Sequence, residues 1–206
     1  MPTKGELTRE NILGIAEHII LQKGFSGTSI DEIIAAANIT KGGFFYHFKG
    51  KEDLARHLMI RYQKADDTFF NGLFDRADSL SEDPLQQMLI FLKLLAEAMG
   101  NLPETHPGCL VASFTYENQQ FNEDVKQIIC DCLVGWRTLF VKKLARISKT
   151  YSMKVETDIM ELADTLTSIV EGGIILSRAF NEPERLVNQI LQYRNYIRLL
   201  YGDIQD

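Results

Sequence analysis

Apolar residues recur at helical spacing along nearly the whole of this 206-residue chain, and this periodicity limits the fold more than any other feature. No stretch shows sustained alternation of apolar and polar residues between turn signals, which is the pattern of a half-buried strand. The segment from Thr8 to Gly24 has an apolar helical stripe, which consists of Ile12, Ile15, Ala16, Ile19 and Ile20. We therefore expect an all-α protein.

The composition is that of a globular chain, with 45% apolar and 24% charged residues. The longest stretch without Asp, Glu, Lys or Arg runs from Thr105 to Tyr116, far short of the roughly 20 residues that a membrane-spanning helix needs. Residues 1–11 show no apolar run followed by a small-residue cleavage site, so no secretory signal is expected. These features predict a cytoplasmic protein.

Motifs of the common enzyme classes are missing from the sequence. There is no G-x-G-x-x-G, no Walker A motif, no G-x-S-x-G and no Glu-x-x-His, and the four histidines are scattered. The three cysteines, Cys109, Cys130 and Cys132, form no C-x-x-C pair, which argues against a disulfide framework and a zinc site. We expect no enzyme activity, no metal and no cofactor.

Charge is distributed unevenly along the chain, whose net charge is −6. Residues 1–61 hold 8 Lys and Arg against 7 Asp and Glu, a balance of +1, whereas residues 62–206 hold 14 against 21, a balance of −7. Within the first part, Ala37 to Lys51 carries three lysines and no acid, interleaved with five aromatic or histidine residues. This pattern favours a nucleic-acid contact, and the alternative is a solvated turn beside an aromatic core cluster.

Helix start and stop signals divide the chain into nine segments. Ser29 to Glu32 has the spacing of a capping box for a short helix to about Ala36, Asn38-Ile39 turns the chain, and Thr40 is the N-cap candidate of the next helix. With Thr8 as the N-cap of the first helix, the predicted helices cover about 9–23, 30–36, 41–47, 51–77, 84–99, 110–118, 123–149, 156–180 and 183–201.

Two short helices joined by the tight turn at Asn38-Ile39, the second of them basic and aromatic, have the dimensions of a helix-turn-helix. The run Thr28-Ser-Ile-Asp-Glu-Ile-Ile-Ala-Ala-Ala-Asn-Ile-Thr-Lys-Gly-Gly-Phe-Phe-Tyr-His-Phe48, with Lys49-Gly-Lys-Glu-Asp-Leu54, resembles the N-terminal domain of the tetracycline-repressor family over residues 6–66. The resemblance implies a dimeric, all-α repressor. Residues 6–66 would read an operator in double-stranded DNA, and helices in 67–206 would bind a small-molecule effector and form the dimer.

The candidate DNA-binding residues have separable roles. Gly42 and Gly43 each cost a helix roughly 0.8–1 kcal/mol relative to Ala, and the gain is close approach to the major groove. Lys41 is expected to reach guanine and Phe44 a thymine methyl, while Phe45 and Phe48 are expected in the core. Phosphate contacts are assigned to Thr40, Tyr46, His47 and Lys51, with a half-buried structural role as the alternative for His47. The full set is Thr28, Ser29, Thr40, Lys41, Gly42, Gly43, Phe44, Tyr46, His47 and Lys51.

The remaining candidates concern the effector and the dimer. Residues proposed to line an effector pocket, with plain core packing as the alternative, are Phe91, Cys109, Phe114, Trp136 and Phe140. Cys109, beside His106, also resembles the cysteine of electrophile-responsive repressors of this family, and the alternative is a small buried apolar residue. Gly172-Gly173 suits a two-fold helix interface or a kink near the pocket. A helical adaptor without DNA binding is the remaining alternative.

Overall fold

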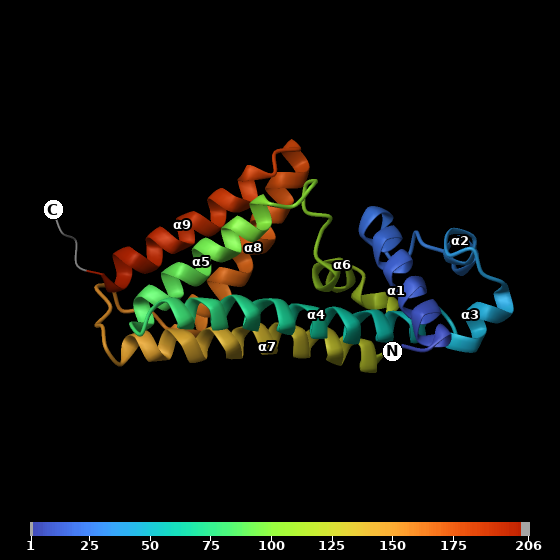
Figure 1. Cartoon of the computed structure of the whole chain (residues 1–206), viewed down its shortest axis with the longest axis horizontal. Helices are drawn as coiled ribbons and strands as arrows, with labels where there is room; N and C mark the ends of the chain where they lie inside the picture. The colour runs from blue at the N-terminus through green and yellow to red at the C-terminus, as the bar shows by residue number, and fades with distance from the viewer. Residues whose placement is uncertain (1, 203–206) are drawn as a thin grey trace. The chain divides into compact units, whose positions relative to one another are not determined.

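The computed structural model describes residues 2–202, which contain nine α-helices and one 3₁₀ helix and no strand (Figure 1). This confirms the all-α prediction. The elements are α1 (Lys4–Lys23), α2 (Ile30–Ala36), α3 (Lys41–His47), α4 (Lys51–Leu80), α5 (Pro84–Gly100), α6 (Leu110–Tyr116), η1 (Asn118–Gln120), α7 (Glu123–Ser148), α8 (Ile159–Phe180) and α9 (Glu184–Tyr201). None of the described helices is long and apolar enough to cross a membrane.

Helix α1 begins one turn earlier than its sequence signal suggests. Thr3 is the N-cap, because its hydroxyl accepts a hydrogen bond from the Glu6 amide and the Glu6 carboxylate accepts one from the Thr3 amide. Thr8, the N-cap expected from the sequence, lies inside the helix and donates its hydroxyl to the Lys4 carbonyl. The other end agrees with the prediction: Gly24 ends the helix with a φ of +83°, a value that glycine adopts without steric cost.

The chain forms two compact units. The first contains the described residues up to Ala65 together with Pro107–Cys132, and the second contains Asp66–His106 and the described residues from Leu133 onward. Helices α4 and α7 therefore each supply residues to both units. Helix α6 packs against α1 within the first unit.

The first unit is held together by aromatic packing between segments distant in sequence. Phe25, directly after α1, lies 5.4 Å from the ring of Phe114 in α6 and 4.6 Å from that of Phe121, and the latter two rings are stacked. All three side chains are buried. Because burial of a phenylalanine contributes roughly 1.5–3 kcal/mol, this cluster anchors α6 to the N-terminal helices.

Helix α9 packs against both α5 and α8 in the second unit, and it runs beside α5 in Figure 1. Gly173 of α8 lies tightly against α9, since a Cβ there would lie 2.8 Å from Leu186 Cδ1 and 3.1 Å from Leu186 Cα. The Tyr193 hydroxyl, buried in the same layer, donates to the Leu162 carbonyl. The small residue at 173 therefore permits this helix packing within one chain.

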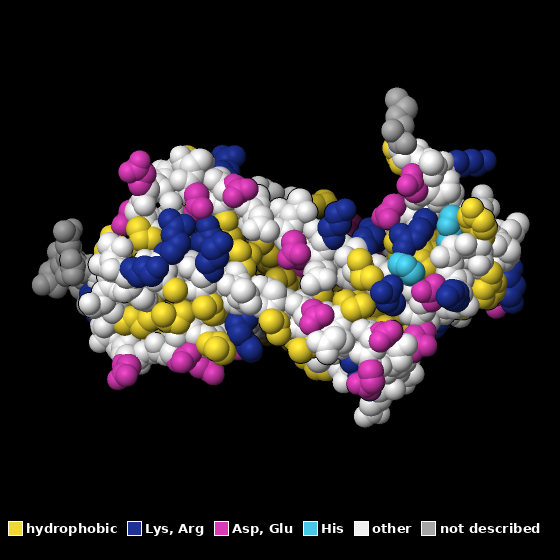
Figure 2. Space-filling view, turned by 90° about the horizontal axis from the view of Figure 1, so that it is seen from below, with side chains coloured by type: hydrophobic (Ala, Val, Ile, Leu, Met, Phe, Trp, Pro, Cys, Tyr) yellow, Lys and Arg dark blue, Asp and Glu magenta, His cyan; other side chains and the backbone are white. Residues whose placement is uncertain are grey.

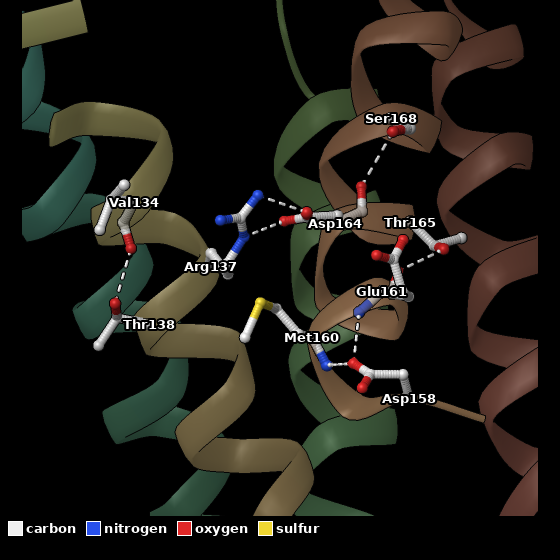
Figure 3. Close-up of polar contacts among 9 residues, drawn as sticks. All are labelled: Val134, Arg137, Thr138, Asp158, Met160, Glu161, Asp164, Thr165 and Ser168. Atoms are coloured by element: carbon white, nitrogen blue, oxygen red, sulfur yellow. Dashed lines mark hydrogen bonds and ion pairs between the residues drawn. The ribbon is translucent and has the colours of Figure 1, made fainter. Parts of the chain in front are cut away.

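A charged pair joins α7 to α8 in the second unit (Figure 3). Arg137 donates from Nε to Asp164 Oδ1 at 2.7 Å and from Nη2 to Asp164 Oδ2 at 2.6 Å. This fork geometry is the strongest form of an arginine–carboxylate contact. The hydrogen bonds from Arg137, together with its positive charge, hold the pKa of the Asp164 carboxyl below its usual value, although burial opposes this effect.

Candidate nucleic-acid interface

The turn between α2 and α3 has the local structure that a helix-turn-helix requires. Ser29 caps α2 by accepting a hydrogen bond from the Glu32 amide, and Thr40 caps α3 by accepting one from the Gly43 amide at 3.0 Å. Asn38 between them has a φ of +51°, a left-handed conformation that asparagine tolerates better than most residues. The predicted caps and the turn are confirmed, but the Glu32 carboxylate pairs with Lys23 instead of completing the expected capping box.

Helix α3 exposes one face and buries the other. Phe44 is 0% exposed and packs against Phe48, with 5.6 Å between the ring centroids. Phe45 is 45% exposed, Tyr46 is 83% exposed, and the Lys41 side chain is 71% exposed. Figure 2 shows Lys, Arg and His side chains among hydrophobic ones on the surface of the first unit.

These positions correct two sequence-based assignments. Phe44 was expected to meet a thymine methyl and Phe45 to pack in the core, but the burial of the two rings is the reverse. The reason is the helical register: Phe44 lies four residues before the buried Phe48 and shares its face, whereas Phe45 is turned about 100° away. The aromatic side chains of α3 that remain available to a base are Phe45 and Tyr46.

The assignment of Thr28 to the DNA-binding surface also needs correction. Its side chain is 2% exposed, and its hydroxyl donates to the Gly24 carbonyl at 2.8 Å, so it stabilises the turn between α1 and α2 from inside. Ser29 and Thr40 use their hydroxyl oxygens as helix caps. Thr40 is exposed, and because only its hydroxyl oxygen takes part in the cap, its hydroxyl proton can still be donated to another acceptor.

The two glycines of α3 are not required by packing within the chain. A Cβ at Gly42 would meet no atom closer than the Thr40 hydroxyl oxygen, at 3.9 Å, and a Cβ at Gly43 would lie 3.4 Å from the same atom. Both residues have ordinary helical φ values. The packing of the chain therefore gives no reason to prefer glycine over alanine at position 42.

Two lysines of the region, Lys41 and Lys51, have partners within the chain. Lys41 lies 3.9 Å from Asp31, a weak pair because both side chains are largely exposed. His47 is half-buried beside the Tyr46 ring. Lys51 donates from Nζ to the Phe25 carbonyl at 2.5 Å and lies 4.2 Å from the centre of the Phe25 ring. Burial lowers the pKa of Lys51, and the charge of Glu117 partly opposes this effect.

Comparison with known proteins decides the family. Residues 12–58 match the model of the bacterial regulatory proteins of the tetR family, and residues 84–189 match the C-terminal domain of LmrA/YxaF-like transcriptional regulators. The chain belongs to the TetR family. The families it matches are transcriptional regulators rather than enzymes, as the sequence predicts.

Two curated TetR-family relatives show the extent of the likeness. The transcriptional regulator AcuR of Cereibacter sphaeroides is 25% identical over 183 residues, which cover 87% of this chain and 80% of AcuR. The transcriptional repressor NemR of Escherichia coli K12 is 23% identical over 195 residues, or 92% and 94% of the two chains. A solved TetR-family regulator from Agrobacterium tumefaciens, at 18% identity, covers 97% of this chain and 100% of its own with a TM-score of 0.80, which shows the same fold.

The residues predicted to line an effector pocket fall into two separate clusters. Phe91, Trp136 and Phe140 lie in the second unit around Phe70, and Phe91 stacks on Phe74 with 3.7 Å between centroids. Cys109 and Phe114 lie in the first unit, where Phe114 belongs to the cluster with Phe25. The sequence could not separate the aromatic members of these sets, because Phe91, Phe114 and Phe140 all occur at helical spacing.

One contact in the first unit has no local sequence signal. Glu117 ends α6, and its carboxylate accepts hydrogen bonds from the backbone amides of Phe25 and Ser26. The partners are 92 and 91 residues apart in the chain. A single acidic residue after a short helix predicts nothing of this kind, so only the folded chain reveals the contact.

Proposed function

We propose that this TetR-family protein is a cytoplasmic homodimeric repressor, which binds a near-palindromic operator through α3 and is released by a small, mostly apolar effector. The observation that carries the DNA-binding part is the exposed face of α3. It combines Lys41, Phe45 and Tyr46 with a glycine, Gly42, that the packing of the chain does not require. NemR of Escherichia coli and DhaR of Mycobacterium are transcriptional repressors, and this supports the same direction of control here.

The exposed apolar surface of α8 and α9 supports the dimer. Ile175 and Leu199 are each 55% exposed, and further exposed apolar side chains on these helices are those of Leu176, Phe180 and Tyr196. A Cβ at Gly172 would meet no atom within 4 Å, so this glycine faces away from its own chain. A second copy covering this face would bury it in an isologous contact.

The effector part rests on the aromatic cluster of the second unit. Its rings, from Phe70, Phe74, Phe91, Trp136 and Phe140, would give an apolar molecule stacking surfaces if it displaced their mutual contacts. Linkage requires that such an effector bind the free dimer more tightly than the operator complex, by the same factor as it weakens operator binding. An effector with equal affinity for both would contradict this mechanism.

Genomic selection tests the proposal. The purified protein is incubated with sheared DNA of its source, bound fragments are sequenced, and recovered sites are checked by gel shift, including the DNA upstream of its own gene. The expected site is a near-palindrome whose half-sites are centred about 34–36 Å apart or a multiple of that distance. Failure to enrich any sequence would favour the helical adaptor.

A sensor role for Cys109 is the second candidate, and one observation favours it. Cys109 is the N-cap of α6, and its sulfur accepts a hydrogen bond from the Ala112 amide at 3.5 Å. A thiol-reactive electrophile that modified this sulfur would remove the cap. Cys109→Ser should then bind the operator normally but resist release by the electrophile, while Cys130→Ser should respond like the wild type. If the electrophile still releases the Cys109→Ser variant from the operator, Cys109 has only a packing role.

A further inference from the structure

The carboxylate of Glu117 occupies a site formed by the turn between α1 and α2. Its Oε1 accepts a hydrogen bond from the Phe25 amide at 2.6 Å and its Oε2 accepts one from the Ser26 amide at 2.7 Å. Consecutive backbone amides that converge on one anion form a nest, which stabilises negative charge. Glu117 is therefore bound as an anion by the turn, at the C-terminal end of α6.

The turn is shaped to the carboxylate. Gly24 has a φ of +83°, which strains any larger residue, and a Cβ at this position would lie 2.8 Å from Glu117 Oε1, so a larger residue would also displace the carboxylate from its seat. On the other side of the Phe25 residue, the Lys51 ammonium binds the Phe25 carbonyl. The turn is thus held from α6 through its amides and from α4 through a carbonyl oxygen.

The electrostatics favour the charged form of Glu117. Burial alone would raise the pKa of its carboxyl, but the hydrogen bonds from Ser26 and Phe25 and the charge of Lys51 outweigh that effect and lower the pKa. A hydrogen bond to an ionised group is stronger than one between neutral groups, so loss of the charge would loosen the turn.

The turn determines where α2 begins. The Thr28 hydroxyl binds the Gly24 carbonyl, and Ser29, the next residue, caps α2. Helix α2 leads directly through the turn at Asn38 into α3. A shift of Gly24–Ser26 would therefore move the start of the two helices that hold the exposed face of α3.

We propose that Glu117 is a positioning residue for DNA binding: seated in the Gly24–Ser26 turn, it makes α6 part of the DNA-binding unit and sets the orientation of α2 and α3. This inference rests on the proposed function, since it concerns how the DNA-binding surface is held. Glu117 does not itself contact DNA in this account.

Glu117→Gln is the sharpest test. The substitution keeps the shape and the aromatic contacts of α6, but it removes the charge and can place an amide NH₂ against a backbone N–H. Operator affinity should fall roughly tenfold, since a charged hydrogen bond is lost. Amide exchange of Phe25 and Ser26 should accelerate. Affinity for a scrambled duplex should hardly change. The slope of the logarithm of the binding constant against the logarithm of the salt concentration (the log–log salt slope) should stay the same, because no phosphate contact is removed.

Glu123→Gln is the matched control. Glu123 is in the same compact unit, its side chain is 88% exposed, and its loss changes the net charge by the same amount. The charge change alone should tighten DNA binding slightly in both variants, so only Glu117→Gln should weaken it. Equal operator affinities of the two variants would overturn the inference, as would unchanged exchange of Phe25 and Ser26. If the wild type and Glu123→Gln both fail to select any DNA, the proposed function itself is wrong.

Discussion

At the residue scale, Gly42 separates the demands of folding from those of binding. The chain leaves room for a Cβ at this position, and alanine favours a helix over glycine by roughly 0.8–1 kcal/mol. Gly42→Ala should therefore raise the free energy of unfolding by up to about that amount while it lowers operator affinity, since the new methyl group lies on the exposed face of α3. Chemical denaturation and a binding titration measure the two effects. A variant that is more stable and binds DNA as well as the wild type would remove Gly42 from the interface.

Lys41 and Lys51 should respond differently to removal. Lys41→Ala should relax the choice of sequence at a cost of ~1–3 kcal/mol per half-site, because a lost base contact penalises only the correct sequence. Lys51→Ala should weaken binding to all sequences and reduce the log–log salt slope by ~0.9 per subunit, or ~1.8 for the dimer, if Lys51 meets a phosphate.

Salt titrations of both variants on operator and scrambled duplexes check this assignment. In the free protein the Lys51 ammonium binds the Phe25 carbonyl, so the ammonium must leave this carbonyl before it can reach a phosphate. An unchanged slope for Lys51→Ala, with a loss of operator affinity, would mean that Lys51 acts only through the turn. A reduced slope for Lys41→Ala without a change in preference would reverse the two roles.

At the element scale, the Arg137–Asp164 pair joins α7 to α8 and should make stability depend on pH. The pKa of Asp164 is lowered in the folded chain, so its contribution is fully present above the ordinary value of 3.8 and is lost as the pH falls through the lowered pKa. Because both side chains are more than a third exposed, Asp164→Asn should cost only about 0.5–1 kcal/mol at pH 7.

Denaturation of wild type and Asp164→Asn at pH 7 and at a series of lower pH values checks the sign. The difference between the two proteins should shrink as the pH falls through the lowered pKa of Asp164, because protonation of the wild-type carboxylate removes the ion pair. A difference that stays the same over the whole series would show that the ion pair does not cause it.

The packing of α8 on α9 gives a second prediction at this scale. Gly173→Ala should destabilise the chain by ~1–3 kcal/mol, because its Cβ would lie 3.1 Å from the backbone of Leu186, which cannot move without parting the helices. Gly172→Ala is the control, since its Cβ would meet nothing within the chain. Unfolding titrations at protein concentrations too low for dimerisation should give changes in the free energy of unfolding that have opposite signs for the two variants. Equal stabilities would contradict the tight contact at Gly173.

Local signals in the sequence predict elements well and contacts between elements poorly. The caps Ser29 and Thr40 and the helix end at Gly24 depend on residues within one turn, and the structure confirms them. The prediction of Thr8 as the N-cap of α1 was wrong, because Thr3 and Glu6 form a capping box one turn earlier. The exchange of Phe44 and Phe45 shows a further limit: in a run of aromatic residues, only the tertiary structure decides which one is buried.

Glu117 and α6 illustrate the same limit over a longer range. The Glu117 partners are some 90 residues away, and no periodicity links them. The prediction of the effector residues met the same limit. Phe114 and Phe140 both lie at helical spacing in the sequence, but they belong to different compact units. Residue type and spacing identify an aromatic core, but not which core a ring joins.

For the whole molecule, dimerisation through α8 and α9 is the expectation on which operator symmetry depends. A double variant, Ile175→Glu with Leu199→Glu, places charges on two exposed apolar positions of these helices and should shift the protein to a monomer in sedimentation. Its operator affinity should fall with dimerisation, because the two half-sites can then no longer be bound as a unit.

Leu80→Glu is the control for this change. Leu80 is also exposed and apolar, but it ends α4 and lies outside α8 and α9. It should leave the dimer intact. A double variant that sediments as a dimer, or a wild type that is a monomer at micromolar concentration with and without DNA, would place the interface elsewhere or exclude it.

The central claim is that this TetR-family chain reads DNA sequence through α3, and the ratio of its affinities for the selected operator and a scrambled duplex of equal length tests it most directly. Both titrations are made at one physiological salt concentration, because phosphate contacts respond to salt on any sequence. Operator binding should be at least ~10³-fold tighter than binding to the scrambled duplex. A ratio near one would contradict it, since the basic and aromatic face of α3 would then bind DNA without reading it.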